Sequence, residues 1–313
     1  MNAPEYSTKS AKVMMNRVSN MPFRWSLNPY RGCSHGCSFC YARGTHAFLG
    51  FEADDTFRTQ VLVKSNAAQV LEAQLEKMAK KHNWNLASLA DEMGSIAVGT
   101  ATDPYQAIEA KARITRSCLE VLARYQVPVS ITTRSPLILQ DVDILGKMNL
   151  QSINISIHTL NPEIWRGLEP SSPAPAKRLE ALSQLHKENL PVGVFLAPII
   201  PLLTDSTPDL SRLLNEIKRH GAGFVMPSVL RLSNDVRPWF MQWVRERYPD
   251  VERPLGRLYR NGYPPQSYVE LKMSRVRLLM ARFDLPTYES ISKSVGRRPA
   301  DLRPAREQLI LPI

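Results

Sequence analysis

Three of the chain's four cysteines lie within eight residues, in the run C-S-H-G-C-S-F-C that contains Cys33, Cys37 and Cys40. Three thiols cannot pair off into internal disulfides, and clustered cysteines in a chain with so few are more often metal ligands or catalytic groups. Thiolates are the usual ligands of iron–sulfur clusters, and three of them can hold three irons of a cubane [4Fe–4S] cluster. The remaining iron keeps an open position, which is typical of a catalytic metal site. The spacing therefore predicts a catalytic iron–sulfur loop.

A single zinc ion is the alternative for this loop, with His35 or His46 as the further donor. Zinc sites usually combine two C-x2-4-C pairs, or one such pair with H-x3-5-H, and here the second pair is missing. We therefore favour the iron–sulfur cluster, and expect His35 to hydrogen-bond near it or to face solvent. Cys118 falls on the apolar stripe of a predicted helix, so we expect it to be a buried small hydrophobe and not a ligand.

Alternating strands and helices are predicted around the cysteine loop. A first strand ends just before Cys33, in W-S-L-N-P-Y-R. Such alternation predicts a parallel sheet with right-handed crossovers, and strands this apolar are buried on both faces. We expect an α/β fold, a partial (β/α)6 barrel, with functional residues at the carboxyl ends of its strands. The further strands are predicted at 95–102, 127–133, 152–157, 191–199 and 223–230.

The helices between these strands are predicted from apolar residues at helical spacing. Asn66 and Asp209 stand where helix N-caps are expected, and Gly221 where a C-terminal glycine is expected. The apolar stripes comprise Val70, Leu71, Leu75 and Met78; Ile114, Cys118, Val121, Leu122 and Tyr125; Leu179, Leu182 and Leu185; and Leu210, Leu213, Leu214 and Ile217.

Composition divides the 313 residues into four parts. We predict an N-terminal segment (1–23), the barrel core (24–230), a basic, aromatic-rich C-terminal extension (231–285) and a flexible tail (286–313). Residues 231–313 hold 16 Lys or Arg against 9 Asp or Glu, a surplus of 7 in a chain whose net charge is +11. No apolar run approaches the ~18 residues of a membrane span, and no apolar segment follows the N-terminus. We expect a cytoplasmic protein without a membrane segment, since its few cysteines suit a reducing compartment.

The run N-P-Y-R-G-C-S-H-G-C-S-F-C-Y-A-R resembles the radical S-adenosylmethionine (SAM) superfamily, and more narrowly its spore photoproduct lyase branch, which is DNA repair photolyase-like. Further matches follow in the family's order and at predicted strand ends, so that the resemblance covers about residues 24–230. These matches are T-D-P-Y-Q (102–106), I-T-T-R-S-P-L (131–137), I-S-I-H-T-L (155–160), L-E-P-S-S-P-A-P-A-K-R-L (168–179) and V-F-L-A-P-I-I-P (194–201).

The resemblance implies a cofactor site built from residues of these motifs. Cys33, Cys37 and Cys40 would ligate the [4Fe–4S] cluster, and the open iron would bind the amino and carboxylate groups of SAM. Phe39 and Tyr41 would border the adenine, with Phe39 giving an apolar face. The alternative for Phe39 is an ordinary place in the core.

Four more residues are placed near the cofactor by the resemblance. Arg134 falls near the carboxylate of SAM, which a guanidinium can bind bidentately, and Ser156 reaches the ribose or the carboxylate. The alternatives are that Arg134 pairs with Asp141 or Asp143, and that Ser156 bonds to a neighbouring strand. The other two residues, in the loop that approaches the amino group, are Thr102 and Asp103.

The resemblance also implies the reaction. An external one-electron reductant, flavodoxin- or ferredoxin-like, reduces the cluster, and SAM is cleaved to methionine and a 5′-deoxyadenosyl radical. This radical abstracts a hydrogen atom from a substrate carbon. The cofactor supplies the difficult chemistry, while the protein positions it and keeps water away.

Nucleic acid is the first substrate class that the resemblance suggests, because spore photoproduct lyase repairs a thymine dimer in DNA. The basic extension suits this substrate, since arginine neutralises phosphate and aromatic rings stack on bases. Trp239, Phe240 and Trp243 also stand at helical spacing, and the alternative is that they pack a helix on the barrel. The candidate contacts are Arg237, Arg245, Arg247, Arg257, Arg260, Trp239, Trp243 and Tyr259.

One position departs from the lyase pattern. Thr100, in V-G-T-A-T-D, stands where the lyase has a cysteine that returns a hydrogen atom to the repaired base. A hydroxyl O–H bond is too strong for that role, and Cys118 lies on a helix out of reach, so we do not expect the exact lyase reaction. Two alternatives stay open. The same enzyme class could act on a peptide, protein or metabolite, or the chain could be a non-catalytic cluster or zinc protein that binds nucleic acid; the intact strand-end motifs argue against the second.

Overall fold

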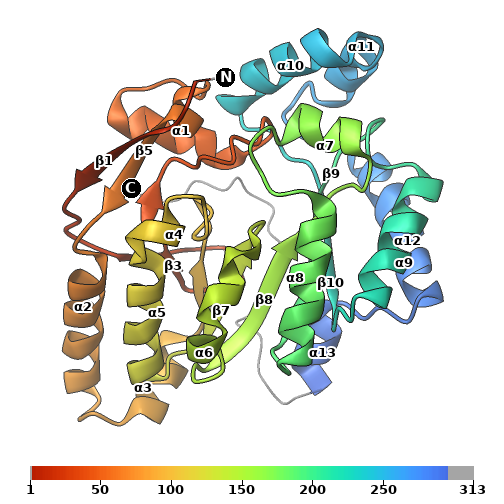
Figure 1. Cartoon of the computed structure of the whole chain (residues 1–313). Coiled ribbons are helices and arrows are strands. Elements are labelled where there is room, and N and C mark those ends of the chain that lie inside the picture. Colours follow the sequence, from red (N-terminus) through yellow and green to blue (C-terminus); the bar gives the residue numbers. More distant parts are fainter. Residues whose placement is uncertain (1, 295–313) are drawn as a thin grey trace.

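The computed structural model describes residues 2–294, in which strands and helices alternate as the sequence predicts (Figure 1). The strands are β1 (Glu5–Lys9), β2 (Met15–Arg17), β3 (Trp25–Leu27), β4 (Tyr30–Arg31), β5 (Gln60–Lys64), β6 (Ile96–Val98), β7 (Val129–Thr133), β8 (Leu150–Ser156), β9 (Val192–Ile199) and β10 (Val225–Val229). The α-helices are α1 (Thr56–Thr59), α2 (Ala67–Lys81), α3 (Leu86–Met93), α4 (Glu109–Ala112), α5 (Ile114–Tyr125), α6 (Val142–Leu145), α7 (Pro162–Leu168), α8 (Pro175–Lys187), α9 (Thr207–Arg219), α10 (Val236–Arg247), α11 (Pro249–Leu258), α12 (Gln266–Arg282) and α13 (Tyr288–Ser294), and the 3₁₀ helices are η1 (Tyr41–Leu49) and η2 (Pro136–Asp141).

The main sheet of the described chain has seven strands in the order β10-β9-β8-β7-β6-β3-β2. β3, β6, β7, β8, β9 and β10 run parallel, and β2 pairs antiparallel with β3 at one edge. These six parallel strands are the six predicted ones, so the partial (β/α)6 barrel is confirmed. The barrel is open, because β2 and β10 are the two edges of the sheet.

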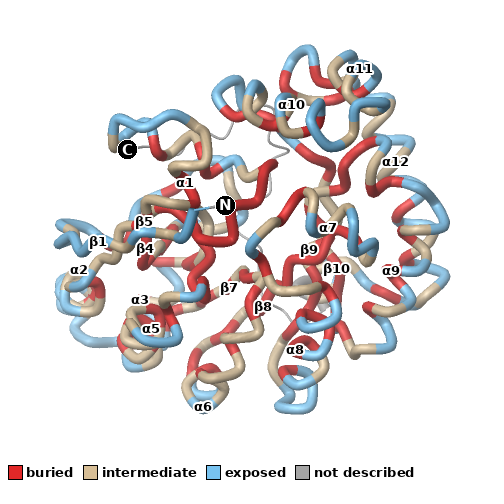
Figure 2. The backbone as a smooth tube through the Cα atoms, turned by 45° about the horizontal axis from the view of Figure 1, so that its top comes forward, coloured by how far each residue is buried: buried red, intermediate tan, exposed pale blue. Residues whose placement is uncertain are grey.

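The two faces of the parallel strands differ in composition. The outer face is apolar: Val98, Ile131, Ile153 and Val192 occupy one register layer and pack with the helices in a single core. Figure 2 shows these helices around the outside of the curved sheet. The opposite face, which we call the inner wall, has small and polar side chains. Its register layers are Ser26, Ala97, Ser130 and Ser152, then Thr132, Asn154 and Gly193.

A second sheet of three strands, in the order β1-β5-β4, stands beside the barrel. β1 and β2 lie in the predicted N-terminal segment 1–23, where the sequence indicated no strand. β4 carries the chain from the first barrel strand to the cysteine loop, and its Tyr30 pairs with Val63 of β5. The second sheet thus holds the start of that loop.

The C-terminal extension divides between two places. α10 and α11 lie at the same end of the barrel as α1 and α7 (Figure 1), and their apolar side chains pack in a cluster with Cys37, Phe39 and Leu168. α12 contacts α9 and β10 at the open edge. Of the predicted tail, Tyr288–Ser294 form α13 and Thr287 pairs with Val225; residues 295–313 lie outside the described residues.

Candidate cluster and cofactor site

The cysteine loop lies at the carboxyl ends of the strands, as expected, and is held there by backbone hydrogen bonds. Cys33 N donates to Phe57 O at 2.8 Å, and Ser38 N donates to Leu168 O at 2.9 Å. Cys33 and Cys37 are buried, and Cys40 is half-buried. Burial raises the pKa of the Cys33 thiol to about 12, with a further contribution from the Asp103 charge. A thiolate is therefore stable here only beside a strong positive charge, and a coordinating metal supplies one.

Two glycines let the loop take its shape. Gly32 has φ +80° and Gly36 has φ +66°, in the left-handed region that favours glycine. A Cβ at Gly32 would lie 2.6 Å from Gln60 O, and one at Gly36 would collide with the side chain of Arg58. The loop therefore presses directly against the neighbouring backbone and a buried arginine.

Thr102 and Asp103 connect the loop to the strand ends. Thr102 Oγ1 donates to Gly32 O at 2.6 Å, and Asp103 N points at Cys33 Sγ at 3.5 Å. The Asp103 carboxylate accepts from Thr133 Oγ1 at 2.6 Å and from Arg134 N at 2.7 Å. The two predicted residues thus lie at the loop, with their side chains engaged in protein contacts.

The Asp103 carboxylate also faces a residue of the cysteine loop itself. His35 is buried, and its Nδ1 lies 3.3 Å from Asp103 Oδ2. Burial alone would raise the pKa of Asp103, but the charge and hydrogen bond of His35, with the hydrogen bonds from Thr133 and Arg134, lower it to about 2. His35 is therefore buried within the site, beside the Asp103 carboxylate, and does not face solvent.

Arg134 and Phe39 come together beside the cysteines. The guanidinium carbon of Arg134 lies 5.8 Å from the centroid of the Phe39 ring, and Arg134 Nε donates to Glu169 Oε1 at 2.8 Å. The alternative partners, Asp141 and Asp143, bind Arg116 instead, at 3.0 Å and 2.7 Å. Phe39 is buried in the cluster it shares with α10 and α11, so it is both a core residue and a wall of the site.

Glu169 is a functional candidate that sequence reasoning missed. Its buried carboxylate binds Arg134 and Arg178, accepts from Ser172 Oγ at 2.9 Å, and lies 3.4 Å from His158 Nδ1. Burial would raise the pKa of this carboxyl, but the charges of Arg178, His158 and Arg134 hold it well below its usual range. Glu169 thus stays ionised at the centre of a buried network.

Three buried polar atoms on β8 and just beyond it have no hydrogen-bond partner. They are Asn154 Oδ1, Ser156 Oγ and His158 Nε2. The three residues alternate along the strand, so they share the inner wall. The Ser156 hydroxyl makes no bond to a neighbouring strand, and the His158 ring meets Phe39 edge-on at 5.3 Å. Buried polar groups without partners are rare and call for a ligand or ordered water.

These features test whether the residues fit the implied cofactors. The donor set of three thiols, two of them buried and one half-buried, suits a cluster with one open iron, and the unpartnered atoms beside Arg134 suit a polar ligand with hydroxyl and carboxylate groups. Within residues 2–294, no three His, Cys, Asp or Glu side chains converge tightly enough to hold a single metal ion. A cubane places its ligands on separate irons, so this spread is compatible with it. The residues therefore fit the group.

Tyr41 extends from the cysteine loop to Thr100, the residue that we expect to stand in place of the lyase cysteine. Its hydroxyl donates to the carbonyl of Thr100, while its side chain stays 43% exposed. Thr100 Oγ1 in turn accepts from Asn28 Nδ2 at 2.9 Å. The hydroxyl of Thr100, just after the end of β6, is therefore already hydrogen-bonded to Asn28. Cys118 is fully buried in the main core, as expected.

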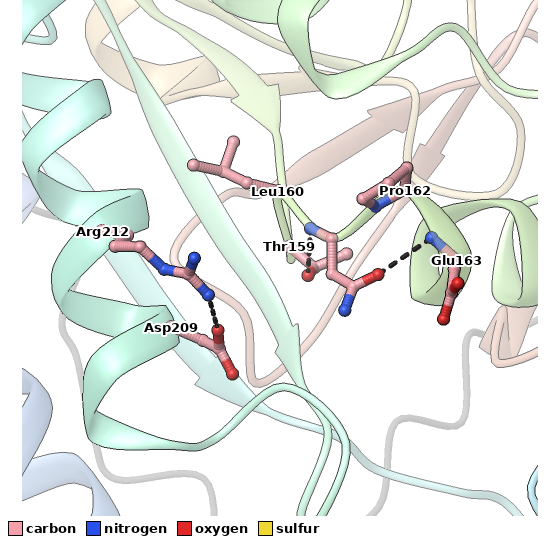
Figure 3. Close-up of a pocket in the computed structure, with 7 residues that line it drawn as sticks. Thr159, Leu160, Pro162, Glu163, Asp209 and Arg212 are labelled. Atoms are coloured by element: carbon pink, nitrogen blue, oxygen red, sulfur yellow. Dashed lines mark hydrogen bonds and ion pairs between the residues drawn. The ribbon is translucent and has the colours of Figure 1, made fainter.

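A pocket of about 450 Å³ opens directly after His158, between the start of α7 and the first turns of α9. Figure 3 shows Arg212 and Asp209 of α9 across from the Thr159–Glu163 segment. Arg212 pairs with Asp209, and Asn161 Oδ1 accepts from Glu163 N at 2.9 Å. None of the residues predicted for the site lines this pocket, which stands beside the cofactor site and outside it.

The aromatic residues of the extension serve mainly in packing. Trp243 Nε1 donates to the carbonyl of Gly167, and the buried Tyr259 hydroxyl donates to Leu230 O at 3.0 Å. Trp243 and Phe240 belong to α10, and Phe240 is fully buried. The predicted alternative, that this helix packs on the barrel, therefore holds for these two residues. Four of the remaining basic candidates are surface groups: Arg245 pairs with Glu252, Arg247 covers the Trp243 ring, and Arg257 and Arg260 are exposed. Arg237 is half-buried, and its buried Nε has no hydrogen-bond partner.

Comparison with known proteins agrees with this geometry. The family model of the Radical SAM superfamily matches residues 27–214, and the chain belongs to this superfamily. It is thus an enzyme of the radical SAM class with an unassigned substrate. An uncharacterized protein from Mycobacterium tuberculosis is 36% identical over 281 residues, which cover 88% of this chain and 79% of that protein. Another from Methanocaldococcus jannaschii is 27% identical over 62% of this chain and 68% of its own length.

The fold is similar to that of spore photoproduct lyase. A mutant of that enzyme with bound AdoMet and dinucleoside spore photoproduct superposes with a TM-score of 0.66 at 15% identity, over 89% of this chain and 79% of the lyase. This similarity confirms the expected lyase-like fold. No helix in the part of the chain that the structure describes is long and apolar enough to cross a membrane.

Proposed function

We propose that this chain binds a [4Fe–4S] cluster through Cys33, Cys37 and Cys40 and uses it with SAM. The observation that carries the proposal is one buried loop with three thiols, facing an arginine and a row of unpartnered polar atoms. When bound, these groups supply reductive cleavage of SAM, and the resulting radical takes hydrogen from a substrate. An external one-electron reductant, flavodoxin- or ferredoxin-like, is the partner that such chemistry needs.

The protein residues bind and orient the cofactor in this proposal. Arg134, held by Glu169, faces the SAM carboxylate, and the free hydroxyl of Ser156 bonds to the ribose or the carboxylate. Phe39 and Tyr41 border the adenine. Thr102 and Asp103 hold the loop from the side of the amino group, since their own hydrogen bonds run to the loop and to the end of β7.

For the substrate we propose a nucleic acid or nucleotide. The similar lyase holds a dinucleoside, and this chain carries exposed arginines on α10 and α11, at the end of the barrel where the cysteine loop lies. The exact lyase reaction is not part of the proposal, because Thr100 replaces the hydrogen-donating cysteine.

A peptide, protein or metabolite is the second candidate substrate. The observation that favours it is the packing of Trp243 and Tyr259, which bond to the protein backbone and are not free to stack on bases.

Anaerobic reconstitution of the full chain tests the proposed cofactors. We expect iron and sulfide in the ratio of one [4Fe–4S] cluster, and formation of 5′-deoxyadenosine and methionine from SAM with dithionite. Replacing Cys33, Cys37 and Cys40 together by Ala should abolish the thiolate-to-iron absorption, whereas Cys118→Ala, which alters a thiol in the core, should keep it. Stoichiometric zinc in the pure protein, or loss of the cluster in Cys118→Ala, would contradict the proposal.

A further inference from the structure

Arg43, three residues after the last loop cysteine, lies beneath the cysteine loop and is completely buried. Its Nε donates to Cys37 O at 2.9 Å and its Nη2 to Gly36 O at 2.6 Å. Nη1 donates to the carbonyl of Asp54. The guanidinium therefore binds the buried side of the loop, and all its acceptors are neutral carbonyl groups.

Other buried arginines near the site have a carboxylate partner. Arg58 Nε donates to Asp55 Oδ1 at 3.0 Å, and Arg178 pairs with Glu169. Arg43 forms no ion pair with any carboxylate among residues 2–294. Arginine does not lose its proton in proteins, and a buried charge without an opposite charge is strongly unfavourable. The missing counter-charge of Arg43 therefore has to come from something that binds beside it.

Burial lowers the pKa of Arg43, and the charges of Cys40, Cys37, Asp55 and Cys33 act in the opposite direction. Asp55 already pairs with Arg58, so the three cysteines are the groups that can supply a further negative charge. A cubane with three thiolate ligands is anionic, and it becomes more so when it gains an electron. We propose that Arg43 is the buried counter-ion of the cluster and raises its reduction potential. This inference rests on the proposed cluster site.

The direction of the effect follows from electrostatics. Reduction adds one negative charge, and a fixed cation in a poorly solvated site stabilises the reduced cluster more than the oxidised one. Net charge, hydrogen bonds and solvent exposure are the factors by which a protein sets the potential of an iron–sulfur cluster. Arg43 acts on the first of these directly, and so makes the electron easier to accept.

Two aromatic rings shield the guanidinium from water. Its carbon lies 4.9 Å from the centroid of the Trp239 ring and 5.5 Å from that of Phe57. Trp239 belongs to α10, so the C-terminal extension covers the charge that sits under the cluster loop. Low solvent exposure preserves the field of Arg43, because water would screen it.

The midpoint potential of the reconstituted full chain tests this inference, measured without SAM by a redox titration followed by electron paramagnetic resonance. Arg43→Gln should shift the potential to a more negative value. Arg43→Lys keeps the charge and should stay near the wild type, although its cluster content should fall because lysine cannot bond all three carbonyls. The matched control combines Arg58→Gln with Asp55→Asn, which removes an ion pair beside the same loop and leaves the net charge unchanged; its potential should not change.

A potential in Arg43→Gln equal to that of the wild type would overturn the inference, and so would an equal shift in the charge-neutral control that combines Arg58→Gln with Asp55→Asn. If Arg43→Gln takes up no cluster, Trp239→Leu is decisive: it keeps Arg43 but admits water, and should shift the potential in the same negative direction. No shift there would overturn the inference as well. Failure of the proposed function is distinct, since the wild type would then hold no cluster at Cys33, Cys37 and Cys40.

Discussion

Glu169 holds Arg134 by its Nε atom, 2.8 Å from Oε1, and no described residue accepts a hydrogen bond from the two terminal nitrogens of that guanidinium. Arg134 is therefore fixed at its inner end and free at its outer end. Such a fixed fork suits bidentate binding of a carboxylate. In the proposed function, Glu169 acts through Arg134 as a positioning residue.

The first prediction concerns this pair. Arg134→Ala should weaken SAM binding by about 1.5–3 kcal/mol, the usual value of a hydrogen bond to a charged group. Glu169→Gln should weaken it by about tenfold, because Arg134 then loses its orienting charge. Calorimetric titration of the reconstituted protein with SAM measures both. Glu120→Gln, which alters an exposed carboxylate paired with Arg116, is the control and should bind normally. Wild-type affinity in Arg134→Ala would give Arg134 a purely structural role.

The second prediction is a pH dependence of stability. The pKa of Glu169 lies well below its usual range, since the charges around it outweigh its burial. Such a carboxyl stabilises the fold above its unfolded pKa of about 4.3, and this stabilisation is lost as pH falls through the lower folded value. Asp103, with a pKa of about 2, acts with the same sign. Thermal unfolding should therefore show a steep loss of stability below about pH 4.

Glu169→Gln should reduce this acid sensitivity. The variant should unfold at a lower temperature than the wild type at neutral pH, where the ionised network is complete, and the difference should narrow as the solution is acidified. Glu120→Gln should follow the wild-type curve. A difference that is constant across the acid range would mean that Glu169 is not the group that titrates.

The third prediction concerns nucleic acid. If the extension binds phosphates, DNA or RNA affinity should fall steeply with salt, each contact adding about 0.7–0.9 to the log–log slope. Replacing Arg245, Arg247, Arg257 and Arg260 by Gln should flatten that slope and leave SAM cleavage intact. The control is the replacement by Gln of three exposed arginines of α12, which should leave the slope unchanged: Arg275, Arg277 and Arg282. Salt-insensitive or undetectable binding in the wild type would favour a peptide or metabolite substrate.

The fourth prediction follows from Thr100. Spore photoproduct lyase binds the thymine dimer called the spore photoproduct. Repair of this dimer by the wild-type chain should be weak or absent, because the Thr100 hydroxyl cannot return the hydrogen atom. Thr100→Cys supplies a thiol and should raise the yield of repaired thymine, whereas Thr100→Ser should not. Chromatography of products from a dinucleoside substrate measures this. Efficient repair by the wild type would show that another residue donates the hydrogen.

Much of the fold could be predicted from the sequence because its signals are local. The six barrel strands are short apolar runs, and the cysteine spacing is visible without any structure. Gly221 indeed ends α9, with φ +81°. β1 was missed because its side chains, E-Y-S-T-K, are mostly exposed and give no apolar pattern. β1 pairs with β5, which is 55 residues away in the sequence, and the residues of β1 alone do not predict this pairing.

The N-caps show how a local signal can mislead. Ser206, not Asp209, caps α9: Ser206 Oγ accepts from Asp209 N, and Asp209 occupies the reciprocal acidic position of a capping box. Asn66 stands at the N-cap of α2, but its side chain bonds to the backbone of Ala11 instead. The residue types were informative, while their partners depended on how the chain folds back.

Site residues that belong to a motif could be predicted from the sequence. A residue whose role depends on its burial could not. Cys33, Cys37, Arg134 and Ser156 come from recognisable motifs, and the structure brings them to one end of the barrel. Glu169 lies in the run E-P-S-S-P, whose composition is typical of an exposed turn. Its burial depends on Arg134, Arg178 and His158, which lie on separate elements, so only the fold identifies it as central.

The composition of the inner wall has a consequence for how this enzyme can evolve. Along β7 and β8, alternate residues lie on different faces: Ile131 and Ile153 pack in the apolar core, whereas Thr132 and Asn154 face the inner wall. Gly193 of β9 has no such freedom, because a Cβ there would lie 2.5 Å from Phe224. Substitutions at Thr132 or Asn154 change the inner wall and leave the apolar residues of the outer face in place. The lining of the barrel interior can therefore vary at these two positions separately from the core that joins the sheet to the helices.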